Sequence, residues 1–192
     1  TQINDAMLSS LARAIRQCTG HDTLRIDLEG HGREHIEGNV DISRTVAWFT
    51  TLFPVTLELP TNADAKTALL SISAQLQRIP DRGLSYGLLR YGSDDPNVRH
   101  ELARMAASPL VFNYLGQFDA VVAESKLFSF ASESTGPWRS PRARRTHPLE
   151  VIAVVRDGQL EVSWHHDAPA DAIATVEKLA NTMLTSLQEL VA

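Results

Sequence analysis

Residues 27–36, DLEGHGREHI, bring three acidic side chains, two histidines and an arginine into ten positions. Glu29 is the first candidate for chemistry, because a carboxylate in a partly desolvated pocket can act as a general base. The alternation of the residues before it places Glu29 on the face opposite Leu28, at the end of a strand. The competing interpretation is a solvated glutamate paired with Arg25 or Arg33.

His31, His35 and Glu37 raise the question of a metal ion in the same stretch. A zinc site usually takes three or four ligands whose spacing is set by a helical turn or a knuckle. Here a glycine stands beside His31 and no cysteine is near. We therefore expect no metal site.

A second stretch, HHDAPAD over residues 165–171, contains the paired histidines and aspartate that are also found in acyltransferase active sites. It follows a predicted strand that ends at Trp164 and precedes a predicted helix. We interpret it as a connection in which Asp167 or Asp171 caps the helix.

The basic cluster RSPRARR, Arg139 to Arg145, allows two interpretations. It is either a solvated loop or a docking patch for an acidic partner or a phosphate group. Interleaved aromatic residues are missing, and the net charge of the chain is -5, which argues against nucleic acid. Neither a glycine-rich phosphate loop nor a GxSxG motif is present.

The bulk composition is that of a globular protein with one sizeable core. The 192 residues are 43% hydrophobic and 21% charged. No apolar run reaches the roughly 18 residues of a membrane span, and no signal sequence opens the chain. Cys18, the single cysteine, is expected to be a small buried side chain, and a reducing cytoplasm fits this usage. Because the chain lacks an initiator methionine, we expect an excised piece of something larger.

Hydrophobic periodicity predicts an α/β unit whose helices cover a mixed sheet. The expected helices span residues 2–18, 63–79, 97–107 and 171 onward. Extended segments are expected at residues 23–30, 46–59 and 109–118, and a hairpin at residues 149–166 that turns at Asp157-Gly158. Residues 81–92 are expected to form a loop or short helix, and residues 132–147 an exposed loop.

Four segments in order resemble the motifs of the epimerization domain of nonribosomal peptide synthetases, a relative of condensation domains and of chloramphenicol acetyltransferase. They are LEGHGRE (Leu28 to Glu34), DISRTVAWFTTLFPV (Asp41 to Val55), LSYGLLRY (Leu84 to Tyr91) and FNYLGQFD (Phe112 to Asp119). The resemblance covers essentially the whole chain. Four ordered motifs are far more specific than any one of them alone.

This resemblance implies a V-shaped enzyme of two lobes, each built like chloramphenicol acetyltransferase, with a tunnel for the phosphopantetheine arm of a carrier protein. The substrate travels on that arm, and no cofactor is expected to bind directly. The family inverts Cα of an L-aminoacyl or peptidyl thioester. Its acid/base glutamate corresponds to Glu29, and Asn113 and Tyr114 are expected in the catalytic site. His31, Arg33 and Trp48, which lie in the matching motifs, are expected to bind substrate.

One departure from the family is informative. The HHxxxDG motif of the other lobe is missing, and His165-His166 cannot replace it because Asp-Ala-Pro follows. Residues 1–192 are therefore expected to be the C-terminal lobe only, inactive alone. Its expected partners are a peptidyl carrier protein, the N-terminal lobe and neighbouring synthetase modules, with no nucleic acid or membrane. Two alternatives stay open: a condensation-domain lobe that forms amide bonds, and a non-catalytic docking module for carrier proteins.

Overall fold

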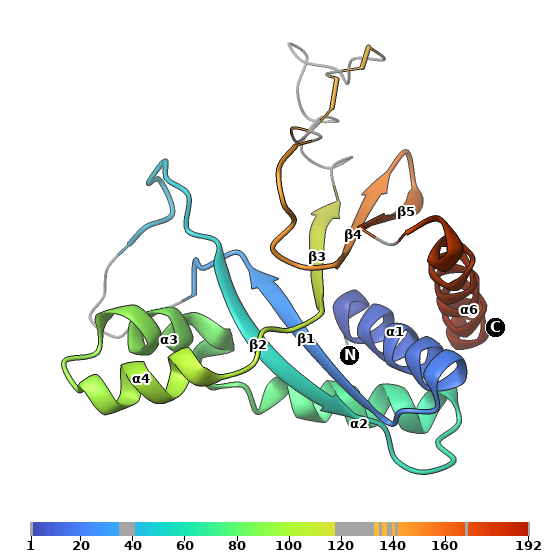
Figure 1. Ribbon diagram of the computed structural model, residues 1–192, viewed down its shortest axis with the longest axis horizontal. Coiled ribbons are helices and arrows are strands. Elements are labelled where there is room, and N and C mark those ends of the chain that lie inside the picture. The colour runs from blue at the N-terminus through green and yellow to red at the C-terminus, as the bar shows by residue number, and fades with distance from the viewer. Residues whose placement is uncertain are drawn as a thin grey trace.

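A five-stranded mixed sheet organises the chain, with strand order β2-β1-β3-β4-β5 (Figure 1). The computed structural model describes residues 2–34, 41–117, 133–134, 136–137, 140, 142–167 and 169–191. Strands β1, β3 and β4 run parallel, whereas β2 and β5 pair antiparallel at the two edges. The bounds are β1 (Thr23–Gly30), β2 (Thr51–Glu58), β3 (Leu110–Gln117), β4 (Leu149–Arg156) and β5 (Gln159–His166).

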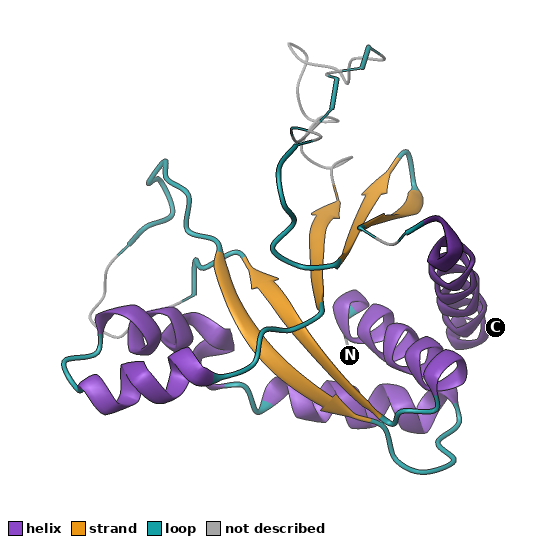
Figure 2. Ribbon diagram, viewed as in Figure 1, coloured by secondary structure: helices purple, strands orange, loops and turns teal. Residues whose placement is uncertain are grey.

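Three long helices form a layer against one face of the sheet (Figure 2). They are α1 (Ile3–Thr19), α2 (Ala65–Gln77) and α6 (Ile173–Val191), and α1 contacts both of the others. The short helix α3 (Leu84–Gly87) lies against β2 and is followed by α4 (Pro96–Arg104). Single turns occupy η1 (Pro80–Gly83), η2 (Leu88–Gly92) and η3 (Ala170–Ala172).

The period of two in β1 separates the two faces of the sheet. Leu24, Ile26 and Leu28 are at most 5% exposed and belong to the core cluster that the helices cover. Because successive strand residues point to opposite sides, Asp27 and Glu29 lie on the face away from these helices. The predicted α/β lobe with a mixed, helix-covered sheet is confirmed.

Local signals in the sequence explain most of the element ends. Gly20 closes α1 in the left-handed region, with φ of 77°, where a residue with a Cβ is disfavoured. The Asp157-Gly158 turn has positive φ at both positions, 52° and 70°, as a type I′ hairpin requires. Pro54 is tolerated in β2 because β2 is an edge strand.

Several sequence expectations need correction. The extended segment predicted from residue 46 begins only at Thr51, because the preceding residues form a loop fixed by side-chain contacts. Cys18 is half-buried, since it lies in the last turn of α1; its Sγ is 3.8 Å from Thr182 Oγ1. The final helix is preceded by η3, whose N-cap is Pro169, while Asp167 forms an ion pair instead of a cap.

Candidate active site

Glu29 and Asn113 meet on the face of the sheet away from the long helices. Parallel pairing sets Asp27 opposite Val111 and Leu28 opposite Phe112, so the next step along both strands brings Glu29 beside Asn113. The Asn113 amide Nδ2 donates to Glu29 Oε2 at 2.5 Å. Both residues are half-buried, so part of each remains exposed to solvent. A donor held against a carboxylate fixes its orientation.

Tyr114 follows Asn113 in β3 but faces the other side of the sheet. It pairs in register with Ala153, which is fully buried, and packs against the core cluster. The structure therefore brings Glu29 and Asn113 together and places the Tyr114 ring in the helix-facing layer. A catalytic role for any of the three stays a prediction.

The glycines after Glu29 allow two backbone segments to approach closely. Gly32 has φ of +65°, and a Cβ added to it would lie 1.6 Å from the carbonyl oxygen of Phe49. A Cβ at Gly30 would lie 2.8 Å from Thr51 Oγ1. The first contact involves rigid backbone, so Gly32 has no tolerated replacement without movement of the loop.

Arg33 holds the loop that contains Trp48. Its guanidinium donates to the carbonyl oxygens of Ile42, Thr45 and Ala47, at 3.0, 2.9 and 3.4 Å. The same group stacks 4.4 Å from the centroid of the Phe49 ring. Arg33, predicted to bind substrate, is thus engaged with its own chain.

The loop carries apolar side chains outward. Trp48 is 90% exposed and Val46 is fully exposed. An indole held in water by a braced loop is available to contact another molecule. Trp48 therefore remains a predicted substrate contact, just before the start of β2, which pairs with the end of β1 where Glu29 lies.

His31 is also exposed and belongs to a small polar chain of contacts. Its Nδ1 accepts from the Arg33 backbone N–H at 2.9 Å, and its Nε2 lies 3.2 Å from Glu34 Oε1. Glu34 Oε2 lies 3.6 Å from Arg82 Nε. The role of His31 in substrate binding stays a prediction. Nothing in the local sequence indicated Phe49 or Arg82, because both are joined to this motif only by the fold.

The basic cluster divides into bound and exposed arginines. Arg145 lies between Glu150 and Asp167, at 3.2 and 2.9 Å. Arg142 and Arg144 are exposed, and Arg139 lies outside the described residues. A docking role for this loop stays a prediction.

His35 and Glu37 likewise lie outside the described residues. Among the residues that the structure does describe, no group of three or more His, Cys, Asp or Glu side chains could hold a metal ion.

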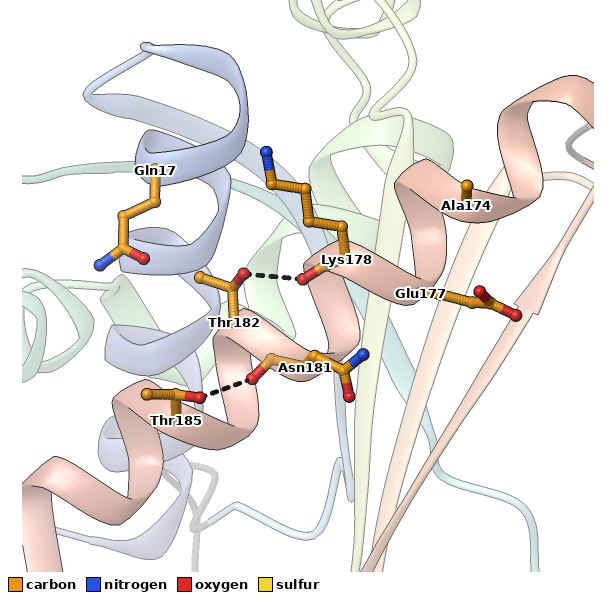
Figure 3. Close-up of a pocket in the computed structure, with 7 residues that line it drawn as sticks. All are labelled: Gln17, Ala174, Glu177, Lys178, Asn181, Thr182 and Thr185. Atoms are coloured by element: carbon orange, nitrogen blue, oxygen red, sulfur yellow. Dashed lines mark hydrogen bonds between the residues drawn. The ribbon is translucent and has the colours of Figure 1, made fainter.

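A groove of about 460 Å³ lies on the helix layer between α1 and α6 (Figure 3). The hydroxyls of Thr182 and Thr185 face it but donate to the carbonyl oxygens of Lys178 and Asn181 in their own helix. Because α6 covers the other face of the sheet, this groove is separate from Glu29 and Asn113.

Comparisons with known proteins identify the family to which the chain belongs. The family described as "Condensation domain" matches residues 1–192. A linear gramicidin synthase of Brevibacillus parabrevis is 43% identical over 192 residues, which is 100% of this chain and 2% of that protein. Bacitracin synthase 3 of Bacillus licheniformis is 37% identical over 191 residues, or 100% of this chain and 3% of that protein.

Solved structures agree with the fold. The crystal structure of the epimerization domain from the third module of tyrocidine synthetase B matches with a TM-score of 0.82 and 29% identity, covering 98% of this chain and 42% of that one. PapA2 acyl transferase shares the fold at 15% identity, with a TM-score of 0.65 over 98% of this chain and 39% of its own.

The chain thus spans a small part of the synthases and less than half of the epimerization domain that it matches. No helix in the described part of the chain is long and apolar enough to cross a membrane. Since the family match extends over all 192 residues, the predicted relationship is confirmed: the chain belongs to the condensation-domain family.

Proposed function

We propose that this chain is the C-terminal lobe of an epimerization domain in a nonribosomal peptide synthetase. The observation that carries the proposal is the Glu29–Asn113 pair on the face of the sheet away from the long helices. The likeness to the tyrocidine synthetase epimerization domain, with a TM-score of 0.82, supports epimerization over other activities of the family. The substrate is an L-aminoacyl or peptidyl thioester on the phosphopantetheine arm of a carrier protein.

In the proposed reaction the Glu29 carboxylate takes the proton from Cα of the thioester. The electron pair of the broken C–H bond moves into the thioester carbonyl, whose oxygen gains negative charge. A group on the preceding lobe then gives a proton to the opposite face of Cα, and the D epimer forms without any co-reactant. Thioester α-protons are only weakly acidic, so the reaction needs a positioned base and stabilisation of the enolate oxygen.

The other predicted residues take different roles in this proposal. Asn113 orients the Glu29 carboxylate, and Tyr114 supports Asn113 from the core side of β3. Arg33 acts through the loop that it braces, and Trp48 on that loop contacts the acyl or peptidyl chain. His31, which directly follows the end of β1, contacts the substrate or its arm.

The test uses this chain joined to its natural preceding lobe, with an L-aminoacyl carrier protein in deuterated water. Epimerization replaces the α-proton by deuterium and yields D product, which mass spectrometry and chiral analysis detect. Glu29→Gln is expected to lower the exchange rate by about 10²- to 10⁴-fold, the usual contribution of a general base. Glu101→Gln, on the exposed surface of α4, is the matched control and leaves the rate unchanged.

Two results would contradict the proposal. The condensation family also suggests amide-bond formation, so a peptide product without α-exchange would assign a condensation lobe. Carrier binding without either reaction would assign a docking module. Exchange that survives Glu29→Gln would keep epimerization but remove Glu29 from its role.

A further inference from the structure

The two inner parallel strands β3 and β4 begin with the same local pattern. Ser108-Pro109-Leu110 opens β3, and His147-Pro148-Leu149 opens β4. Leu110 and Leu149 are register partners, and the Leu149 backbone N–H donates to the Pro109 carbonyl oxygen at 3.2 Å. The two strands therefore start side by side, each with a polar residue two positions ahead of its first residue.

Both polar side chains bind one carboxylate, that of Asp27 in the middle of β1. Ser108 Oγ donates to Asp27 Oδ1 at 2.5 Å, and His147 Nε2 lies 2.7 Å from Asp27 Oδ2. Ser108 is 2% exposed, and the side chains of His147 and Asp27 are 10% and 17% exposed. Opening this cluster would leave buried polar groups without partners, so the folded protein strongly favours keeping it closed.

A proline follows each of the two polar residues. Proline has no N–H, so neither strand can donate a backbone hydrogen bond at Pro109 or Pro148. Ser108 and His147 lie immediately before these prolines, and their side chains provide contacts to Asp27 of β1.

The register of β3 decides which residue lies beside Glu29. A slip of one residue turns every side chain of a strand to the other face. Such a slip in β3 would turn Asn113 toward the core and bring Tyr114 or Phe112 to the face of Glu29. Asp27 lies two residues before Glu29 on the same face of β1, next to the start of β3.

We propose that Asp27 is a positioning residue, which fixes the starts of β3 and β4 through Ser108 and His147 and thereby sets Asn113 against Glu29. This inference deepens the proposed function and rests on it only for its activity readout. Asp27 contacts no substrate in this proposal. It acts through the register of the strands.

The first test measures the Asn113–Glu29 contact by NMR in the two-lobed protein labelled with ¹⁵N-asparagine. Asp27→Ala is expected to move the Asn113 side-chain amide signals toward those seen in Glu29→Ala. The control Asp22→Ala removes an acid just before the same strand, whose partner is Arg16, and leaves the signals in place. Unchanged Asn113 signals in folded Asp27→Ala would overturn the inference.

The second test measures α-proton exchange, where displacement of a catalytic group by about 1 Å can cost up to about a hundredfold in rate. In Asp27→Ala, kcat is expected to fall within that range while KM is unchanged. His147→Gln retains a donor and is expected to keep the rate, whereas His147→Leu lowers it. If Asp27→Ala does not fold, the two His147 variants decide: equal rates and equal Asn113 signals in both would overturn the inference.

The two tests separate this inference from the proposed function. Wild-type protein without exchange, but with Asn113 signals that move in Asp27→Ala, would refute epimerization and retain the positioning role. Exchange that depends on Glu29 but not on Asp27 would support epimerization and refute the positioning role of Asp27.

Discussion

The sheet has one face covered by α1, α2 and α6 and an opposite face, the open face, which points away from these helices. Both faces are built from alternating residues of the same strands. On the covered face, Leu28 and Phe112 pack in a continuous core under α1, α2 and α6. On the open face, Asn113 of β3 donates to Glu29 of β1, and Asp27 binds Ser108 and His147, which lie just before β3 and β4. Leu28 and Phe112 therefore belong to the core, whereas their neighbours Glu29 and Asn113 are the residues to which the proposed function assigns chemistry. Substitutions of Phe112 and of Asn113 should therefore affect different properties.

Phe112 and Asn113 provide the sharpest test of this division, because they are adjacent in β3. Phe112 is 1% exposed, so Phe112→Ala is expected to lower the free energy of unfolding by about 3–5 kcal/mol. Asn113→Ala is expected to lower the free energy of unfolding by only about 1 kcal/mol. It is expected to impair α-proton exchange more strongly than Phe112→Ala does. Denaturant unfolding of both variants measures the contrast. A stability loss in Asn113→Ala as large as that of Phe112→Ala would break it.

Gly32 tests whether the loop before β2 depends on the close approach of its Phe49 backbone to Gly32. Gly32→Ala combines positive φ with a clash against Phe49, so the loop must move. Gly20→Ala has similar φ but meets no atom within 4 Å, and should cost only about 1–2 kcal/mol of backbone strain. We expect the ¹⁹F signal of fluorotryptophan at Trp48 to shift in Gly32→Ala alone. Equal, unshifted signals in both variants would argue against the close approach.

Asp64 offers the smallest effect, confined to the helix layer. It caps α2, and hydrogen bonds from the side chain and then the backbone of Thr67 lower its pKa below 3.8. A lowered folded-state pKa means that its stabilisation is present above pH 3.8 and is lost as pH falls through the folded pKa. Asp64→Ala should therefore lower Tm at pH 6 and lose this deficit under strongly acidic conditions. A deficit in Tm that is constant across this range would show that the cap acts without its charge.

Much of the fold was accessible from local sequence, for reasons that these elements illustrate. The alternation in β1 and the Asp157-Gly158 turn each depend on residues close together in the chain. The family resemblance drew attention to Glu29 and Asn113 but could not give their contact, which spans 84 residues and depends on parallel pairing. It also could not show that Tyr114 faces the core or that Arg33 braces a loop.

Asp27 shows more clearly what local sequence could not predict. It shares the face of Glu29 through the alternation of β1, but its partners Ser108 and His147 come from two distant connections. The repeated polar-Pro-Leu pattern is visible in the sequence. Only the structure shows that the polar residues of both copies contact the same carboxylate, that of Asp27.

The strand order has a further consequence for how the molecule is made. The β4–β5 hairpin closes through a two-residue turn, and such local pairings form within microseconds. The β1–β3 pairing must enclose about 80 residues, and pairings between distant segments are slow to form. The Glu29–Asn113 pair should therefore assemble among the last contacts of the sheet. Local elements such as this hairpin can therefore begin to form before the contact between Glu29 and Asn113 exists.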